Sequence, residues 1–344
     1  MKLGIIGLPR SGKSTVFEAL TKSILGATRV GESRIGTIRV PDRRIDALSD
    51  MYHPRKTIYA QVEYLLPGTI PTQKEHLRDQ NQWTATRDCD ALVHVIRNHG
   101  GAGFGEKSPD KDFVEMEQEL ILADLVVVEK RLERIELDHQ RGKKMDAQEH
   151  TLLIQCRQKL ENEVPLRRIA ELASARKLRG FAFLSAKPML VLFNNDDEDD
   201  RLPETGNLIS AEECLVIRGK LEQELAQISA EDAADFLNEF DIAESAMDRV
   251  IQKSYHLLGL ISFFTIGKDE IRAWTIKRGT QALDAADVVH SDMKKGFIRA
   301  EVLAFDDLMD AGTYAAARKK GTVRLEGKTY EINDGDILDI RFNV

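Results

Sequence analysis

The sequence predicts an α/β protein built on a doubly wound parallel sheet, with an inserted antiparallel helical hairpin and a small α+β domain at the C-terminal end. Three observations lead to this fold class. Short apolar runs alternate with helical segments in the 344-residue chain, and a glycine-rich loop joins the first apolar run to a helix. The pattern then changes character near residue 111 and again near residue 259. A chain of this length is expected to form two or three domains.

The first predicted strand, residues 2–6, runs directly into Gly7-x-x-x-x-Gly12-Lys13-Ser14, and a helix is expected over 13–22. Glycines let such a loop point its backbone N–H groups at phosphates, and the helix adds its positive N-terminal end. We expect Lys13 to reach the β- and γ-phosphates and the Ser14 hydroxyl to take one Mg²⁺ position. The motif predicts a nucleotide-phosphate site formed by Gly7, Pro9, Arg10, Ser11, Gly12, Lys13, Ser14 and Thr15.

The remaining strands of the sheet are short, mostly apolar runs of the kind that parallel sheets bury on both faces. They are predicted at 60–66, 91–96, 189–193 and 213–217, with helices at 73–88 and 219–227. Ligands of such sheets bind at the carboxyl ends of the strands. His94, inside an apolar run, is expected in the core, whereas His99 follows that strand close to the expected phosphates.

Residues 111–180 carry a helical repeat in place of this alternation. Apolar residues recur at steps of three and four, the pattern stops at Gly142-Lys-Lys, and it restarts near Leu152. Two amphipathic helices joined by a polar turn form an antiparallel helical hairpin, for which a coiled coil is expected. Most of its charged residues are expected to form a solvated face, but a projecting hairpin can also dock a partner.

After a helical stretch at 230–258, the chain becomes rich in short β-type runs. One helix is expected at 281–291, and strands are expected at 262–266, 272–276, 296–301, 322–325 and 337–342. This predicts an α+β domain of a size that can fold alone. It contains two basic clusters, whose surface is either simply solvated or contacts RNA: Lys294, Lys295, Arg299, Arg318, Lys319, Lys320 and Arg324.

Composition excludes several classes of protein. The sequence has no run of 18 apolar residues, so no membrane span is expected, and the first strand follows Met1-Lys2 so closely that we expect no signal peptide and a cytoplasmic protein. The three cysteines are far apart, which predicts neither a disulfide framework nor a zinc site. A net charge of −8 gives no reason to expect DNA specificity.

Many stretches resemble the YchF-type P-loop ATPases, an Obg-related branch of the translation-factor GTPases. The resemblance includes Gly7-Leu-Pro-Arg-Ser-Gly-Lys-Ser-Thr-Val-Phe17, Val40-Pro-Asp-Arg-Arg-Ile-Asp-Ala-Leu48, Asp90-Ala-Leu-Val-His-Val-Ile-Arg97 and Ala123–Arg134. Near the C-terminus, Arg272–Ile276, Lys295–Glu301 and Phe342-Asn-Val344 are similar to the family's TGS domain, which is ubiquitin-like.

The resemblance implies three parts: a nucleotide-binding G-domain (1–110 and 181–258), the inserted hairpin (111–180) and a TGS-like domain (259–344). It also implies Mg²⁺ with ATP or GTP as the ligand, and hydrolysis linked to the ribosome. RNA or ribosome contacts through the hairpin and the TGS-like domain would follow from it.

The chain departs from the family pattern in both switch regions. Switch I is shortened to residues 29–38, where Thr37 either replaces the magnesium-contacting threonine or is simply a strand residue. Switch II reads Val62-Glu-Tyr-Leu-Leu-Pro-Gly68, so Gly68 is retained while apolar residues replace the family's Asp. Glu63 lies upstream of that position, and Pro67 stiffens the loop. A phosphate loop without these groups predicts that binding survives better than turnover.

The base-recognition motif has two possible alignments. Asn194-Asn-Asp-Asp197 follows from the preceding Lys187-Pro188, and Asn195-Asp-Asp-Glu198 restores the Asn-x-x-Glu spacing of the family. The backstop behind the base is expected at Arg218-Gly-Lys220. The family spacing favours adenine, and we expect Asn194, Asp197 and Gly219 to be nucleotide-binding residues.

Two functions therefore remain. The first is a YchF-like nucleotide-binding protein that binds ATP or GTP and hydrolyses it slowly, with a role in translation or stress. The alternative is a catalytically inactive paralogue that serves as an RNA- or protein-docking module. No residue is assigned as catalytic from the sequence.

Overall fold

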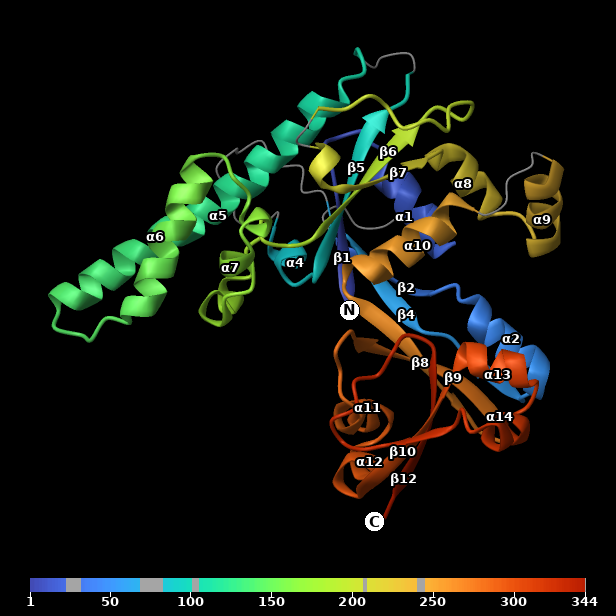
Figure 1. Cartoon of the computed structure of the whole chain (residues 1–344). Coiled ribbons are helices and arrows are strands. Elements are labelled where there is room, and N and C mark those ends of the chain that lie inside the picture. Colours follow the sequence, from blue (N-terminus) through green and yellow to red (C-terminus); the bar gives the residue numbers. More distant parts are fainter. Residues whose placement is uncertain (23–31, 69–82, 101–104, 207–208, 240–244, 344) are drawn as a thin grey trace. The chain divides into compact units, whose positions relative to one another are not determined.

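The computed structural model describes residues 1–22, 32–68, 83–100, 105–206, 209–239 and 245–343 (Figure 1). Its contacts group the chain into two compact units. The first contains Met1–Thr37 and Glu63–Val250, and the second contains Ile38–Val62 and Ile251–Val344. The sequence-based prediction placed all of residues 1–110 in the nucleotide domain, so it differs from this grouping for residues 38–62.

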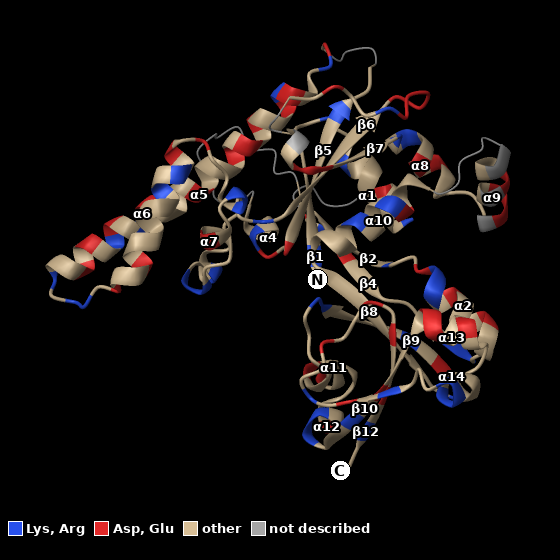
Figure 2. Cartoon of the chain, in the orientation of Figure 1, with Lys and Arg blue, Asp and Glu red and all other residues tan. Residues whose placement is uncertain are grey.

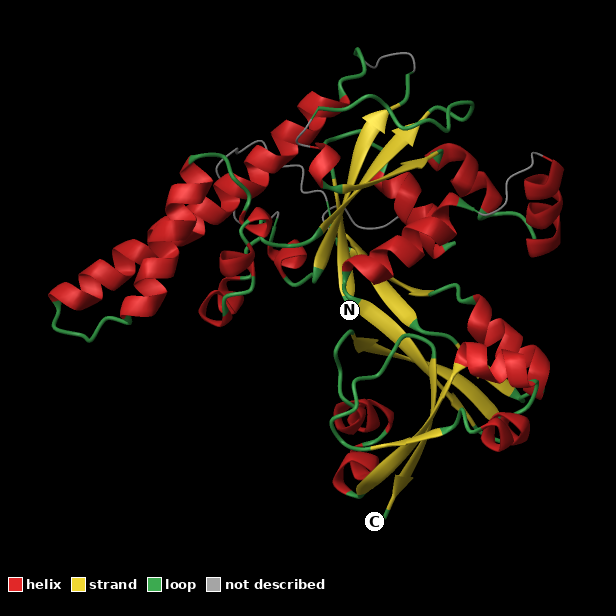
Figure 3. Cartoon of the chain, in the orientation of Figure 1, coloured by secondary structure: helices red, strands yellow, loops and turns green. Residues whose placement is uncertain are grey.

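The first sheet has six strands in the order β2-β4-β1-β5-β6-β7. Strands are drawn in yellow in Figure 3. They are β1 (Lys2–Ile6), β2 (Arg34–Arg39), β4 (Gln61–Leu66), β5 (Ala91–Asn98), β6 (Met189–Asn195) and β7 (Glu213–Ile217). β1 pairs in parallel with both β4 and β5, and β5, β6 and β7 continue the parallel pairing. The predicted doubly wound α/β fold is confirmed, and the strand order reverses at β1, which is where such sheets bind ligands.

The other helices in this part of the chain are α1 (Lys13–Thr21), α4 (Thr84–Arg87), α7 (Ala170–Ala173), α8 (Gly219–Leu225), α9 (Ala230–Glu239) and α10 (Ala246–Leu257). α7 packs through Leu172 in the apolar cluster of the hairpin, and the boundary between the two units falls within α10. α1 buries Val16, Phe17 and Leu20, which recur with helical spacing. The helix predicted at 73–88 falls mostly on residues outside those that the structure describes, and α4 lies within its final part.

The hairpin consists of α5 (Pro109–Gln140) and α6 (Ala147–Glu161), as the repeat predicted. One face of α5 and α6 buries Val128, Leu132, Leu153 and Cys156 in a common apolar cluster. The Asp146 carboxylate accepts from the Gln148 and Glu149 N–H groups and so caps the start of α6.

Two buried ionic groups join the base of the hairpin to its surroundings. The fully buried Asp124 of α5 accepts from Arg87 Nη1 at 2.9 Å and from the Leu184 and Ser185 N–H groups. Arg167 donates to Glu117 of α5 at 2.6 Å and to Glu212. Buried charges with this many partners hold a position strongly, because removing one partner leaves an uncompensated charge.

The second unit contains the other six-stranded sheet, in the order β11-β10-β12-β8-β9-β3. Its strands are β3 (Lys56–Ile58), β8 (Leu260–Ile266), β9 (Glu270–Lys277), β10 (Phe297–Ala304), β11 (Arg324–Glu326) and β12 (Asp336–Phe342). β3 pairs in parallel with β9, and this pairing brings residues from the first part of the chain into the sheet.

The helices of this unit are α2 (Arg43–Tyr52), α11 (Ala282–Val289), α12 (Ser291–Lys295), α13 (Phe305–Ala311) and α14 (Tyr314–Lys320). The prediction of one helix after residue 259 was wrong. The predicted segment 281–291 is divided between α11 and α12 near His290, which caps α12, and α13 and α14 were not predicted. Each of the latter has seven residues, too few for a clear helical repeat.

Candidate nucleotide-binding site

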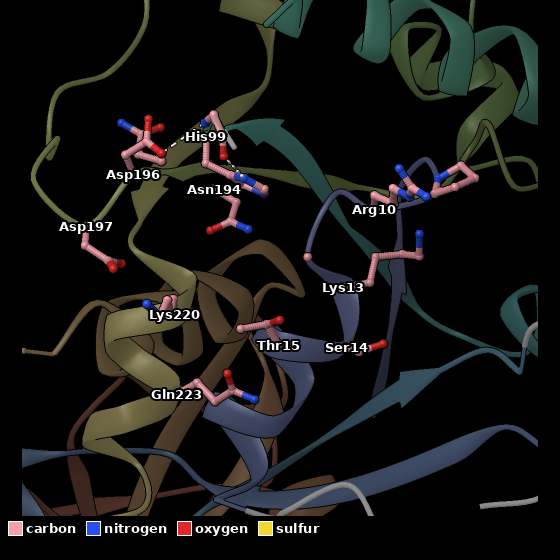
Figure 4. A pocket seen from close by; sticks show the side chains of 14 residues that line it. Arg10, Lys13, Ser14, Thr15, His99, Asn194, Asp196, Asp197, Lys220 and Gln223 are labelled. Carbon is pink, nitrogen blue, oxygen red and sulfur yellow. Dashed lines mark hydrogen bonds between the residues drawn. The ribbon is translucent and has the colours of Figure 1, made fainter. Parts of the chain in front are cut away.

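A pocket of about 780 Å³ lies in the first unit at the carboxyl ends of β1, β5 and β6, beside α8 (Figure 4). This volume is within the range of small-molecule sites. The pocket is lined by Pro9, Arg10, Gly12, Lys13, Ser14, Thr15, His99, Gly100, Asn194, Asn195, Asp196, Asp197, Lys220 and Gln223. The position agrees with the rule for ligands of doubly wound sheets.

The loop between β1 and α1 has the backbone that a phosphate site requires. Gly12 begins the helix at φ 99°, and a Cβ there would overlap the Asn194 side chain. A Cβ at Gly7 would overlap the Val95 carbonyl oxygen. No side chain caps the N-terminus of α1, so its first N–H groups face a ligand with the positive end of the helix dipole.

Lys13 is held by its own loop. Its ammonium group donates to the carbonyl oxygens of Gly7 at 2.7 Å and of Leu8 at 2.6 Å. Burial lowers the pKa of Lys13 to about 8, and the Glu119 carboxylate of α5 acts in the opposite direction. The ammonium group is thus placed in the phosphate loop, with a pKa close to physiological pH.

Asn194 joins the phosphate loop to the turn before α8. Its Nδ2 donates to the Ser11 carbonyl at 3.0 Å, and its Oδ1 accepts from the Gly219 N–H at 3.0 Å. The side chain is buried, and a Cβ at Gly219 would lie 2.6 Å from Oδ1. Both ends of the amide are therefore used within the protein.

Asn195, Asp197 and Glu198 follow Asn194 and belong to the two possible alignments of the base motif. The buried Asn195 side chain accepts from Asn98 at 2.8 Å and donates to the Arg201 carbonyl at 2.9 Å, so its amide is used by the loops. Asp197 is exposed and lines the pocket, whereas Glu198 is not among the described lining residues. Asn194 and Asn195 thus both use their amides within the protein, and Asp197 is an exposed carboxylate of this motif that lines the pocket.

Asp196 connects two walls of the pocket. Its carboxylate accepts from Lys107 Nζ at 2.5 Å and from the Gly100 N–H at 3.0 Å. The hydrogen bond from Lys107, and then that from Gly100, lower the pKa of Asp196. The loop after β6 is thereby attached to the loop after β5, where His99 also faces the pocket.

The structure separates the residues predicted for this site into two groups. Pro9, Arg10, Gly12, Lys13, Ser14, Thr15, Asn194 and Asp197 line the pocket. Gly7, Ser11 and Gly219 are not among its described lining residues and contribute backbone groups or close packing behind the wall. Asn195, Asp196 and Lys220 were predicted only as parts of the base-recognition and backstop motifs, and the predictions for this site omitted Gly100 and Gln223. A signal was available, since each lies just after a parallel strand or in the first turns of α8.

Only some of the residues considered as Mg²⁺ ligands lie at the pocket. Ser14 is exposed in the first turn of α1, as a hydroxyl ligand would be. Thr37 lies inside β2 and Glu63 inside β4, both as strand residues, and the Gly68 N–H donates to Ser33 Oγ at 3.2 Å. Within the described ranges, no group of three or more His, Cys, Asp or Glu residues could hold a metal ion.

Other predictions about polar groups can now be compared with the structure. His94 is buried in β5, stacks on Phe113 with ring centroids 5.7 Å apart, and has its pKa lowered by burial to about 3, so it is a neutral core residue. All three cysteines are free. No helix in the part of the chain described by the structure is both long enough and apolar enough to cross a bilayer.

Comparison with known proteins identifies relatives over the whole chain. Residues 2–131 match the family described as 50S ribosome-binding GTPase, and residues 260–343 match the C-terminal family of YchF GTPases, described as a protein of unknown function. The "Ribosome-binding ATPase YchF" of Bacillus subtilis is 35% identical over 364 residues, which cover 99% of each chain. That of Haemophilus ducreyi is 34% identical and covers 100% of this chain and 99% of the relative.

A solved structure is similar over the same extent. The Schizosaccharomyces pombe YchF GTPase aligns with a TM-score of 0.81 at 28% sequence identity. The alignment covers 99% of this chain and 97% of that one. Similarity in sequence and in structure thus extends over both units.

Proposed function

Because the chain belongs to the YchF family, we propose that it binds a purine nucleoside triphosphate with Mg²⁺ in the pocket and associates with the ribosome. The observation that carries the first part is the intact phosphate loop at the strand-order reversal of the sheet. Lys13 and the N-terminus of α1 supply positive charge there, and Ser14 is the hydroxyl that would ligate Mg²⁺. The Mg²⁺ ion would neutralise phosphate charge once bound.

We further propose that the preferred base is adenine. The Asp197 carboxylate can accept from the exocyclic amine of adenine or from the N1–H and exocyclic amine of guanine, so this residue alone does not select the base. A guanine site would need a donor for O6, but the nearby Gly219 N–H already donates to Asn194. The relatives' name, ribosome-binding ATPase, agrees with this preference.

Calorimetry with ATP, GTP and their non-hydrolysable analogues, with and without Mg²⁺, tests this proposal. We expect magnesium-dependent binding with ATP tighter than GTP, and a loss of about 100-fold in affinity for Lys13→Ala. Lys111→Ala, which removes an exposed lysine of α5 that does not line the pocket, is the matched control. Unchanged binding by Lys13→Ala would contradict the assignment of the pocket.

The second candidate function is a docking module without turnover. The observation that favours it is β4, where Leu65 and Leu66 are buried and Pro67 and Gly68 follow, so apolar residues stand where an acid would hold Mg²⁺ through water. Single-turnover assays with Mg²⁺·ATP separate the two. Hydrolysis that depends on Mg²⁺ and is lost in Lys13→Ala supports the slow ATPase, and binding without hydrolysis supports the docking module.

For the ribosome, we propose the turn of the hairpin as a contact. Arg141, Lys143 and Lys144 are exposed there, and of these Lys143 forms an ion pair with Asp138 (Figure 2). In the C-terminal unit, by comparison, Lys294 is paired with Asp284 and Asp287, and Arg318 and Arg341 are paired with Glu301. Cations without such neutralisation release more counterions when they bind RNA phosphates.

Cosedimentation with ribosomes at increasing salt tests this contact. We expect Arg141→Ala/Lys144→Ala to weaken binding and to reduce its salt dependence, because two phosphate contacts are removed. Lys319→Ala/Lys320→Ala on α14 is the control of equal charge. A larger effect from α14 than from the turn would place the contact in the C-terminal unit.

A further inference from the structure

Arg10 has an unusual conformation at the tip of the phosphate loop. Its φ is 64°, in the left-handed region, between Gly7 at φ 150° and Gly12 at φ 99°. Glycine and asparagine adopt this region readily, and a long side chain seldom does. A non-glycine residue kept in a disfavoured conformation within a ligand-binding loop points to a role for its side chain.

The side chain of Arg10 belongs to the phosphate end of the pocket. It is exposed and lines the pocket together with Lys13 and Ser14 of the same loop. Figure 4 shows Arg10 beside Lys13, whereas Asp196 and Asp197 lie toward the other end. The pocket therefore has an end with two cationic side chains from the loop, and an end where two carboxylates lie together with Lys220.

The two cations of the loop differ in what they can offer a ligand. The ammonium group of Lys13 donates to the Gly7 and Leu8 carbonyls and so stays close to the loop backbone. A guanidinium is planar, has five donors and binds phosphate oxygens in pairs. Arg10 lies at the tip of the loop and has a longer side chain than Lys13. Its guanidinium can therefore reach phosphates that lie beyond the part of the ligand enclosed by the loop backbone.

From this geometry we propose that Arg10 binds the terminal phosphate of the nucleotide and makes the site prefer triphosphate over diphosphate. This inference rests on the proposed function. It assigns to the loop a charge that phosphoryl-transfer enzymes receive from an arginine supplied in cis or by a partner. The contact would also stabilise the charge that develops on the terminal phosphoryl oxygens when ATP is hydrolysed.

The test compares ADP with a non-hydrolysable ATP analogue by calorimetry in Mg²⁺. Arg10→Asn and Arg10→Gly remove the charge with residues that tolerate positive φ, and Arg10→Lys retains the charge without the planar fork. We expect both neutral variants to lose about tenfold in affinity for the analogue and less than about twofold for ADP. Arg10→Lys should recover part of the loss, and Arg134→Asn on the exposed face of α5 should match the wild type.

Thermal unfolding of the same variants separates a role in binding from a role in folding. A phosphate-binding role predicts that Arg10→Gly melts at or above the wild-type temperature, because the strain at φ 64° is relieved. A lower melting temperature with an unchanged ratio of analogue to ADP affinity would show that Arg10 is structural. An equal loss for both nucleotides would also overturn the inference.

The possible failures are distinguishable. If the wild-type chain binds neither nucleotide, the proposed function fails, and the role of Arg10 fails with it. If the wild type binds normally and both neutral variants keep its preference for the triphosphate analogue, only the role of Arg10 is overturned. A parallel fall in the single-turnover rate of the neutral variants would extend the support from binding to catalysis.

Discussion

The surroundings of Lys13 hold its ammonium group in place and lower its pKa. The loop carbonyls of Gly7 and Leu8 hold the ammonium group, while burial makes the charged form less favourable. Phosphate would supply the negative charge that neutral carbonyls lack, so nucleotide binding and protonation of Lys13 are linked.

This linkage predicts a pH dependence of nucleotide binding. With a pKa of about 8, Lys13 is mostly protonated at pH 7 and mostly neutral at pH 9, so ATP affinity should fall about tenfold over this interval. Calorimetry at pH 7, 8 and 9 measures the change. Lys13→Arg is the control, because a guanidinium stays charged and its affinity should be nearly flat. The same fall in both proteins would assign the effect to another group.

A second prediction concerns the buried side chain of Asn194. Asn194→Ala leaves the Ser11 carbonyl and the Gly219 N–H without their buried partner, and should destabilise the chain by about 2 kcal/mol. Urea unfolding provides the measurement. Asp197→Ala changes an exposed lining residue three positions away and should shift stability by less than about 0.5 kcal/mol. Equal effects would mean that the Asn194 clamp adds no net stability.

Whether a single residue of the site can be predicted depends on whether it lies close in the sequence to other residues of the site. The lining residues between Pro9 and Thr15 all belong to one short motif, and Asn194 and Asp197 were found because they have a spacing of their own. Lys220 belongs to the expected backstop, whereas Gln223 belongs to no motif and reaches the pocket only because α8 begins at the end of β7. The left-handed φ of Arg10 could not be read from a sequence that has arginine there.

Among the elements, the stability of the hairpin depends more on the buried Asp124 of α5 than on surface ion pairs. Asp124→Ala removes the partner of Arg87 and of two backbone N–H groups, and should cost about 3–5 kcal/mol. Glu161→Ala removes the exposed pair with Arg157 at 3.8 Å and should cost less than about 1 kcal/mol. Equilibrium urea unfolding compares them, and similar costs would contradict the anchoring role of Asp124.

Elements with a long or strongly periodic pattern were the ones that the sequence revealed. The 32-residue α5 and the apolar β5 and β6 agree with their predicted positions. By contrast, α13, α14 and the three-residue β3 are too short to show a period, and tertiary packing decides their conformation. The predicted TGS identity of the C-terminal region stays a prediction.

For the whole molecule, the grouping of Ile38–Val62 with the C-terminal residues predicts how the chain opens. α2 buries Ile45 and Leu48, Arg44 of α2 pairs with Asp334, and β3 pairs with β9. Under native conditions, amides of α2 should exchange together with those of β8 and β9. Hydrogen exchange on the full chain is the measurement.

A variant makes this prediction sharper. Leu48→Ala should accelerate exchange in α2, β8 and β9, because a core residue of the second unit is truncated, and leave β5 and β6 unchanged. Val191→Ala in β6 is the matched variant for the first unit, where the opposite pattern is expected. Acceleration of α2 by Val191→Ala alone would assign residues 38–62 to the first unit.

The sequence-based boundary at residue 259 could not reveal this grouping. Residues 38–62 lie between β1 and β5 in the chain, and nothing in their composition connects them with a sheet that begins two hundred residues later. That information is carried by pairing between distant strands, which a single sequence does not display.

The second unit cannot be completed until the last part of the chain is made. During synthesis, α2 emerges with Ile45 and Leu48 in place, but β8 and β9, which share its unit, follow about 200 residues later. At the pace of translation this interval lasts roughly 10–40 s. A nascent chain therefore carries the buried residues of α2 for this interval before the strands that share their unit have been made.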